Sequence, residues 1–536
     1  MSMEAGIPLN SIILFFMAIL PIIVIFAGIV CLKKSGTLMA VTGWLLAMIV
    51  AVLFFNTSPV IALYASASGI LASFGISLMV LFTILQVTMM DLTGAIRSIS
   101  EYIRSIAAER YEQIMILNVG FGSFLVSIGA TPVTMLPPIM MALGFSPVAS
   151  VALPCLGYDP LTSFSLLAVP ITLPAAIFGF DAVVMGSQVA LFLPVISTGL
   201  SLGMLWIADG VDGIKKGWVP ALLAGLTLGI FAIVFVNILP ASAIGLVGVF
   251  SGLVTILVLF LHRAVRGRPV LARKPVAGAG DAMPGDQGLM PLGKAVLPWA
   301  LLVILVVVIS IPDIQSSLYH ILGDAQVITV VADRAVDLKL MNQAYFWVVV
   351  STLVAAPFLV RSRDEGKKIA TLWLKRAWSP TLAAALFFAI AYVMDWSGQT
   401  VVNNTLTFVS GSNDLNMNAV IGFSLAMVFG IAFPVISPLL GMFGSFVSGS
   451  ETSSNVMFYG ILQKATSVLS LDFSKVYAAH MVAGGIASGI APAKIINAAS
   501  VIDQSAIEGE AIRKSAVVVV LLALLTSALL VLFLLV

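Results

Sequence analysis

The chain has 536 residues, of which 60% are hydrophobic and 9% charged, and its mean hydropathy is +1.13. These values exclude a soluble domain and indicate an all-α polytopic membrane protein. The net charge of +2 does not indicate a nucleic-acid partner, and two cysteines with three scattered histidines cannot build a disulfide framework or a metal cluster. No metal and no cofactor are therefore predicted.

Apolar segments of bilayer length, or shorter, recur along the whole chain, and none has the alternation of a barrel strand. The first follows an N-terminus with an acid and no Lys or Arg, so we interpret it as a retained span rather than a signal peptide. The segments fall at about 11–31, 37–55, 60–90, 114–130, 132–156, 160–180, 184–207, 218–238, 242–262, 295–312, 344–360, 380–395, 417–440, 443–462, 476–491 and 515–536.

The stretch 114–135 is predicted to be a re-entrant hairpin, because counting every apolar segment in this region as a full crossing conflicts with the basic residues that should lie inside. Residues 121–135 read FGSFLVSIGATPVTM, with Ser127, Thr131 and Thr134 in the interior of the run. An amphipathic segment, 93–112, precedes the hairpin and is expected to lie along the inner membrane surface.

A helix break is predicted in residues 155–174, which read CLGYDPLTSFSLLAVPITLP. Proline removes a backbone donor and clashes with the preceding turn, and the freed carbonyls and new helix N-terminus can meet an ion or an anion. Asp159 is therefore either part of an unwound site or a simple loop acid.

A linker rich in Pro and Gly, 263–293, divides the chain into an N-terminal half, 1–262, and a C-terminal half, 294–536. Each half contains one FGSF run, and basic residues flank the linker. Placing the basic clusters inside puts the linker in the cytoplasm and the acidic segment 313–342 outside.

The second hairpin is predicted at 441–463, where residues 443–457 read FGSFVSGSETSSNVM and match the first hairpin without a gap. A dense cluster of hydroxyls, an amide and one carboxylate between apolar segments indicates a lined cavity, since polar groups at membrane depth are expensive. The alternative is an extramembrane loop. Paired interrupted segments in two halves indicate a transporter binding site, so we expect two inverted halves whose hairpin tips meet near the midplane.

Neutral donors at the two tips are predicted to hold an anionic substrate, because neither hairpin contains an arginine. About 1 kcal/mol from each hydrogen bond gives weak, releasable binding. The residues predicted to bind substrate are Thr131, Thr134, Ser453, Ser454, Asn455 and Ser397. Ser397 lies in a further polar interruption, 395–400, where a helix cap is the alternative.

Glu451 is the predicted proton-coupling group, with Asp159 as a second carrier. A carboxylate beside a bound anion repels it when ionised, so protonation and substrate binding should favour each other. The alternative is that Glu451 only caps the second arm of its hairpin. A second break is predicted at 483–497, where Lys494 could either attract a carboxylate or extend to the membrane interface.

The run FVSGSETSSNVMFYGILQKAT at 446–466 resembles the L-lactate permease family of bacterial and archaeal membranes. Further similarities are TGAI at 93–96, FGSF at 121–124, SGQT at 397–400 and GG at 484–485, so the resemblance covers most of the chain. The chain diverges in the first hairpin, where 124–130 lacks the usual carboxylate, and at Tyr158 and Asp159, where the family usually has Asn-Thr.

The resemblance implies a secondary transporter that imports a small monocarboxylate such as lactate or glycolate with protons, not an enzyme. It also implies the ion-transporter superfamily fold, with a re-entrant hairpin and a discontinuous helix in each inverted repeat. Sodium coupling, another organic anion such as a sulfonate, and a non-transporting complex subunit stay open as alternatives. The oligomeric state is not predicted.

Overall fold

The computed structural model describes residues 9–30, 32, 34–106, 109–129, 132–268, 289–309, 311–331, 334–409, 415–500, 502 and 504–535. Helices dominate this part of the chain, which confirms the all-α prediction. Seven of its helices are long and apolar enough to cross a membrane, or eight if the bent pair Leu297–Ile309 and Asp313–Gln326 forms one span. The chain is therefore a multi-pass membrane protein.

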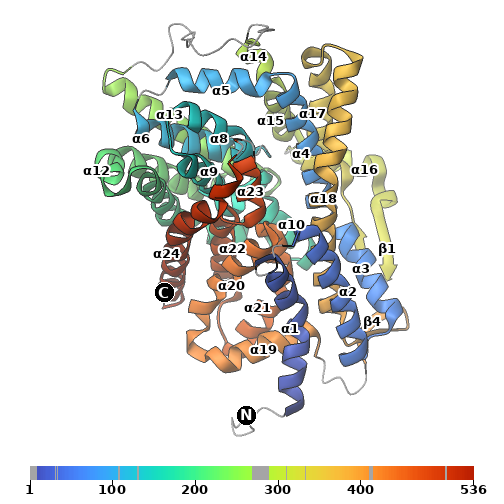
Figure 1. Cartoon of the computed structure of the whole chain (residues 1–536). Coiled ribbons are helices and arrows are strands. Elements are labelled where there is room, and N and C mark those ends of the chain that lie inside the picture. Colours follow the sequence, from blue (N-terminus) through green and yellow to red (C-terminus); the bar gives the residue numbers. More distant parts are fainter. Residues whose placement is uncertain are drawn as a thin grey trace.

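One side of the molecule is a block of long helices that stand side by side (Figure 1). Helices of both chain halves form this long-helix block, since α18 packs against α2, α3 and α4, and α17 packs against α4. The two halves are thus interleaved. The block consists of α2 (Gly36–Phe54), α3 (Pro59–Ala72), α4 (Phe74–Leu92), α15 (Leu297–Ile309), α17 (Ala344–Leu359) and α18 (Arg363–Trp396).

The other side contains the two predicted hairpins and the broken helices, and we call it the hairpin block. From the N-terminal half it contains α6 (Arg110–Ile114), the π-helix η1 (Met115–Phe121), α7 (Gly122–Ser127), α8 (Pro132–Ala142), α9 (Pro147–Leu156), α10 (Val169–Phe178), α11 (Ala182–Ala190), α12 (Leu193–Ile238) and α13 (Val247–Val265). From the C-terminal half it contains α19 (Met417–Phe429), α20 (Phe433–Ser448), α21 (Glu451–Leu469), α22 (Phe473–Ser488), α23 (Pro492–Ser500) and α24 (Glu508–Leu535).

Helix α12 is two helices joined by a tight turn. Asp209 and Gly210 have non-helical backbone angles in its middle. A Cβ on Gly225 would lie 2.5 Å from the backbone nitrogen of Thr198, so the second arm folds back against the first. This agrees with the two separate apolar segments expected at 184–207 and 218–238.

The remaining elements lie around these two blocks. Helix α1 (Leu9–Val30) packs against α2, α19 and α20. In the C-terminal half, α14 (Leu292–Ala295) and α16 (Pro312–Leu322) flank α15. The strands in the described residues form two antiparallel pairs, which the sequence did not predict: β1 (Val327–Val331) with β2 (Arg334–Asp337), and β3 (Gln399–Val402) with β4 (Thr405–Phe408).

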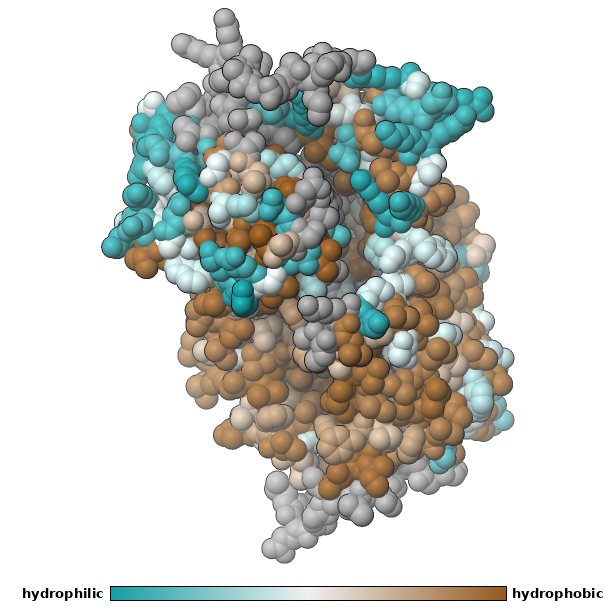
Figure 2. All heavy atoms as spheres, viewed as in Figure 1, coloured by the Kyte–Doolittle hydropathy of each residue, from teal (hydrophilic) through white to brown (hydrophobic). Residues whose placement is uncertain are grey.

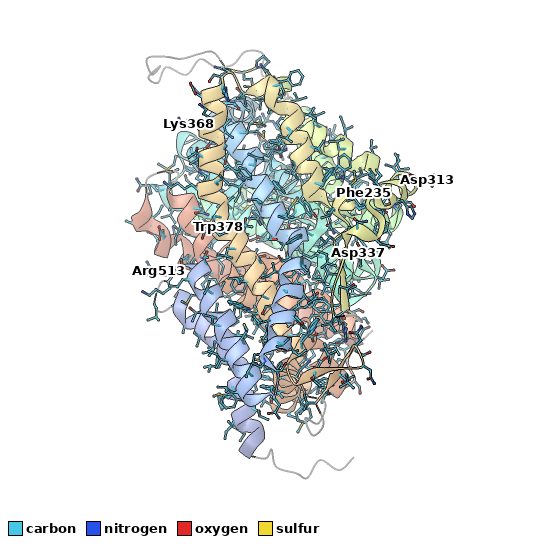
Figure 3. All side chains as sticks on the ribbon, turned by 90° about the vertical axis from the view of Figure 1, so that its right-hand side faces the viewer. Phe235, Asp313, Asp337, Lys368, Trp378 and Arg513 are labelled. Atoms are coloured by element: carbon cyan, nitrogen blue, oxygen red, sulfur yellow. The ribbon has the colours of Figure 1, made fainter. Side chains whose placement is uncertain are left out.

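Hydrophilic residues gather at the upper end of the face in Figure 2, and hydrophobic residues cover its lower part. The amphipathic helix α5 (Ala95–Ile106) lies across that upper end, as expected for a surface helix (Figure 1). Lys368 lies near the upper end of α18 in the turned view, above Trp378 on the same helix (Figure 3). The basic stretch 361–376 therefore lies at the same end as α5.

Both predicted hairpins consist of two helical arms that extend beyond the predicted bounds of 114–135 and 441–463. In the first, α6, η1 and α7 form one arm and α8 the other. In the second, α20 and α21 meet at Gly449, whose φ of +71° suits glycine. Most of the predicted linker lies outside the described residues; α13 continues to Val265 and α14 begins at Leu292.

Candidate functional site

A cleft of about 1580 Å³ opens between the long-helix block and the hairpin block. The surface is hollowed between the two blocks in Figure 2. Helices α4 and α18 line one wall, and residues 158–170, 446–453 and 491–497 line the other. The exposed side chains of Lys34, Arg97 and Arg376 also line the cleft, whereas Glu451 is 6% exposed. The cleft thus has exposed charged residues in its outer part and buried polar residues, including Glu451, in its inner part.

The first helix break lies between α9 and α10, as predicted. Four non-glycine residues of this segment have left-handed backbone angles: Thr162 (φ 41°), Leu166 (φ 50°), Leu167 (φ 57°) and Ala168 (φ 58°). Each such residue stores about 1–3 kcal/mol of strain, and such strain concentrates at functional sites.

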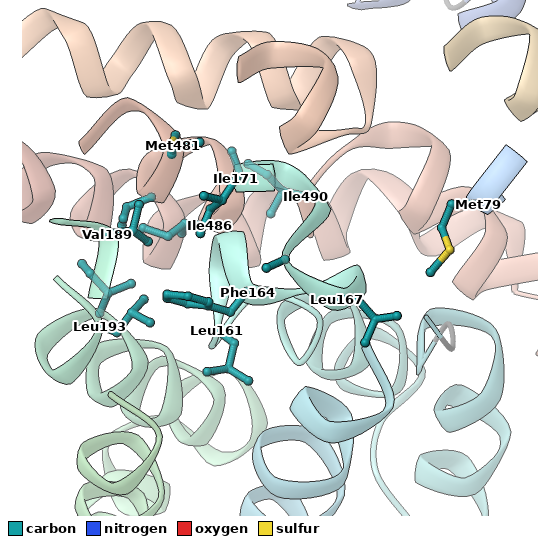
Figure 4. Packing of buried hydrophobic residues seen from close by; sticks show 14 of the residues in the cluster. Met79, Leu161, Phe164, Leu167, Ile171, Val189, Leu193, Met481, Ile486 and Ile490 are labelled. Atoms are coloured by element: carbon teal, nitrogen blue, oxygen red, sulfur yellow. The ribbon is translucent and has the colours of Figure 1, made fainter. Parts of the chain in front are cut away.

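Buried apolar side chains hold this strained segment in place. Phe164 is fully buried and lies among Val189, Leu193 and Ile486 (Figure 4). Pro160 lies in the break, so its carbonyl is not part of a regular helix. Ser197 Oγ donates a 2.5 Å hydrogen bond to this carbonyl. Contacts with α11, α12 and α22 therefore fix the segment in addition to its own backbone hydrogen bonds.

The second break lies between α22 and α23, and it crosses the first. The Gly489 N–H donates a 2.9 Å hydrogen bond to Asp159 Oδ2. A Cβ on Gly485 would lie 2.6 Å from Thr162 Cβ and 2.8 Å from Glu451 Oε2. The absence of side chains at these two glycines lets both breaks meet the tip of the second hairpin.

Glu451 begins α21 and reaches across to the first break, where its Oε1 accepts a hydrogen bond from Ser163 Oγ. The cap of α21 is Ser450, whose Oγ accepts a hydrogen bond from the Ser453 N–H at 3.3 Å. The Glu451 side chain thus joins two distant parts of the chain and is not the cap.

Two buried hydroxyls at this crossing have no hydrogen-bond partner in the described structure. They are Thr162 Oγ1 and Ser453 Oγ, and both residues are 2% exposed and line the cleft. A buried polar atom without a partner is destabilising, so each such atom in a native structure needs an explanation. A ligand in the cleft would supply the missing partner.

Lys494 lies in the first turn of α23 and also lines the cleft. Its Nζ is 3.6 Å from the centroid of the Tyr158 ring, and the charges of Asp159 and Glu451 act on it. The buried part of the cleft therefore holds one cation and two carboxylates. Among the described residues, no group of three or more His, Cys, Asp or Glu side chains could hold a metal ion.

The structure brings Glu451, Asp159 and Ser453 of the predicted residues together in the cleft lining. Ser454 and Asn455 are fully buried beside it: Ser454 Oγ lies 3.5 Å from His480 Nε2, and Asn455 Nδ2 donates to the Pro170 carbonyl at 3.1 Å. These two residues therefore connect α21 to its neighbours.

Of the other predicted residues, Ser397 does not line the cleft. Ser397 lies at the end of α18, where its Oγ donates to the Met394 carbonyl at 2.7 Å and accepts from the Met417 N–H at 2.8 Å. Thr131 lies outside the described residues; Thr134 is in α8, and its side chain is not described. Sequence reasoning missed Thr162 and Ser163, although both lie in the broken stretch that it singled out.

We expect Gly489→Ala to prevent the protein from reaching its folded, active state. The added Cβ would lie 2.5 Å from the Cys155 carbonyl oxygen and closer still to Asp159 Oδ2, so the two breaks would have to separate. Thermal unfolding monitored by size exclusion and an assay of substrate uptake check this expectation. Gly293→Ala is the control, since nothing lies within 4 Å of its added Cβ. A variant as stable and active as the control would contradict the expectation.

Comparison with protein families matches the L-lactate permease model to residues 14–536. The chain is 23% identical over 463 residues to an L-lactate permease of Streptococcus iniae, covering 85% of this chain and 91% of that protein. It is 25% identical over 535 residues to the L-lactate permease of Bacillus subtilis, covering 92% and 91%. It is 23% identical over 518 residues to the glycolate permease GlcA of Escherichia coli, covering 89% and 88%.

Proposed function

The chain belongs to the L-lactate permease family, and we propose that it is a plasma-membrane secondary transporter that carries a small monocarboxylate, lactate or glycolate, together with protons. The observation that carries this proposal is the buried group at the crossing of the two helix breaks. Glu451 there lines the same cleft as the unpaired hydroxyls of Thr162 and Ser453. Relatives named for lactate and for glycolate support this substrate class.

The chemistry of this group suits a small hydroxy acid. Two free hydroxyls can donate to a carboxylate or exchange hydrogen bonds with the substrate hydroxyl, and the N-terminus of α21 favours negative charge. Neutral donors contribute about 1 kcal/mol each, which allows release on the other side.

Proton coupling follows from the position of Glu451. An incoming anion is repelled by an ionised carboxylate in the same cleft, and a proton on Glu451 removes that repulsion. Asp159, held by Gly489 at the same crossing, is the proposed second carrier. A sodium ion is the alternative coupling ion.

We further propose that the two halves are inverted repeats. In each half, a glycine of the first hairpin arm packs on the helix that later breaks. A Cβ on Gly122 would lie 3.0 Å from the Gly157 carbonyl oxygen, and one on Gly441 would overlap the backbone of His480. The FGSF alignment pairs Gly122 with Gly444 and not with Gly441, so this parallel concerns how the two arms pack and is separate from the sequence repeat.

Uptake into proteoliposomes tests the proposed function. Purified protein should accumulate labelled L-lactate or glycolate when the outside is acidic, and a protonophore should abolish this. Accumulation that follows a sodium gradient instead would identify sodium as the coupling ion. If neither gradient drives uptake of either acid, the proposed function is wrong.

Thr162→Val and Ser453→Ala are each expected to weaken substrate binding about fivefold, since each removes one hydrogen bond of about 1 kcal/mol. The KM of uptake should rise while the protein stays folded, because neither hydroxyl has a protein partner to lose. Thr255→Val is the control, since its buried hydroxyl donates to the Ser251 carbonyl and does not line the cleft. Unchanged KM in both cleft variants would place the substrate elsewhere.

A further inference from the structure

We propose that Lys494 is the cationic ligand of the substrate carboxylate, and that Asp159 is the counter-ion which the substrate replaces. This rests on the proposed function and names the residue that distinguishes an acid from its neutral analogue. From the sequence alone, Lys494 could either attract a carboxylate or extend to the membrane interface.

Lys494 lies where its positive charge destabilises the helix but helps to bind an anion. It is the third residue of α23, a helix of nine residues that starts at Pro492. A helix N-terminus carries partial positive charge, so a lysine in its first turn is repelled and an anion is attracted. The ammonium and the helix end therefore both favour negative charge at the same place in the cleft.

Independent evidence for a ligand comes from the opposite side of the crossing. Thr162 Oγ1 and Ser453 Oγ are buried, have no hydrogen-bond partner in the described structure, and belong to residues of the same cleft lining. A carboxylate that takes the Lys494 ammonium has further lone pairs that accept such donors. One small acid can thus use a cation and neutral hydroxyls together.

The ring of Tyr158 is one of the groups that hold Lys494 in the cleft. The lysine Nζ lies 3.6 Å from the centroid of the Tyr158 ring, and such a contact attracts a cation while leaving its charge available. The lysine backbone is also fixed, since its carbonyl is 3.9 Å from Cys155 Sγ. The ammonium, on a flexible side chain, is the part that can change partners.

Asp159 is anchored independently of Lys494. Its Oδ2 accepts the 2.9 Å hydrogen bond from the Gly489 N–H, and the residue is 1% exposed. The negative charges of Asp159 and Glu451 both attract the Lys494 ammonium. A substrate carboxylate would bind the same ammonium, so it must compete with Asp159.

Binding of L-lactate and of L-lactamide to the purified full-length protein tests the proposal. The two ligands have similar shape and differ in charge, so their affinity ratio reports recognition of the carboxylate. We expect Lys494→Met to weaken L-lactate binding by about tenfold or more while L-lactamide binding changes little, which removes the preference for the acid. Lys494→Arg should retain most of the preference. Asp159→Asn should bind L-lactate more tightly, because the competing counter-ion is gone.

Lys464→Met is the matched control, since Lys464 is a half-buried lysine outside the cleft lining. A Lys494→Met protein that keeps the wild-type ratio of affinities overturns the proposal, even if its stability changes. Asp159→Asn that weakens L-lactate binding as much as Lys494→Met overturns the role of Asp159. If wild-type protein neither binds nor transports L-lactate or glycolate, the proposed function itself fails, and this inference with it.

Discussion

Glu451→Gln is expected to abolish pH-driven accumulation of substrate while substrate exchange across the membrane survives. Glutamine keeps the shape of the side chain and can still accept the hydrogen bond from Ser163 Oγ, but it cannot take up or release a proton. Proteoliposomes loaded with unlabelled L-lactate measure exchange, and empty ones with an acidic exterior measure accumulation. The two assays separate binding from coupling.

The same variant should lose the pH dependence of substrate affinity. In the wild-type protein, falling pH neutralises a carboxylate that repels the bound anion, so affinity should rise as pH falls. With glutamine at position 451, this contribution is absent and affinity should change less with pH. Glu510→Gln is the control, because Glu510 is exposed and its carboxylate lies 3.9 Å from the Lys514 ammonium. Full pH-driven accumulation by Glu451→Gln would reduce Glu451 to a structural residue.

The sequence allowed the second hairpin to be predicted because its polar run stands out between apolar segments. Hydroxyls, an amide and a carboxylate in such surroundings need a special reason, and Glu451 and Ser453 do line the cleft. Ser397 carried a similar local pattern, yet its hydroxyl serves the backbone at the end of α18. Local sequence cannot distinguish a hydroxyl that bonds its own neighbourhood from one that faces a ligand.

Thr162 and Ser163 could not be predicted because their roles depend on contacts between distant parts of the chain. The strained angle at Thr162 exists because Phe164 is buried among residues of other helices, and Ser163 meets Glu451 only through the crossing of the two breaks. The family comparison confirms the membership that the polar run suggested. It does not test site roles, so these stay predictions.

Parts of the fold followed directly from hydropathy. The separate segments at 184–207 and 218–238 agree with the two arms of α12 on either side of Asp209 and Gly210. The two strand pairs were missed, since each strand has only four or five residues. The interleaving of the halves could not be seen either, because hydropathy gives the order of helices but not their partners.

A buried ion pair joins the first hairpin to α13. Arg263 is 2% exposed and Glu112 is 3% exposed, and Arg263 Nη1 donates to Glu112 Oε2. Arg268 Nη1 donates to the other carboxylate oxygen at 2.7 Å. One carboxylate in α6 thus holds two guanidinium groups at the end of α13. Removing one partner of such a pair leaves a buried charge without compensation.

Glu112→Gln is expected to destabilise the protein by about 3–5 kcal/mol, because Arg263 stays charged in a buried position. Arg263→Met should be milder, since Glu112 keeps the bond to Arg268. The double variant Glu112→Gln/Arg263→Met should recover much of the loss, because it removes both buried charges. Thermal midpoints in detergent and the folded fraction recovered from membranes measure these differences.

Asp212→Asn is the control for this series. Asp212 and Lys215 form an exposed pair at 4.0 Å, with side chains 78% and 73% exposed, and such pairs contribute about 0–1 kcal/mol. A Glu112→Gln protein as stable as this control would mean that water or a neighbouring group compensates Arg263. A double variant less stable than Glu112→Gln alone would mean that the arginine stem stabilises the junction by packing. If the stabilities of the variants follow the expected order, charge compensation between Glu112 and Arg263 stabilises the outer end of the first hairpin arm. This junction lies away from the cleft where Glu451 acts.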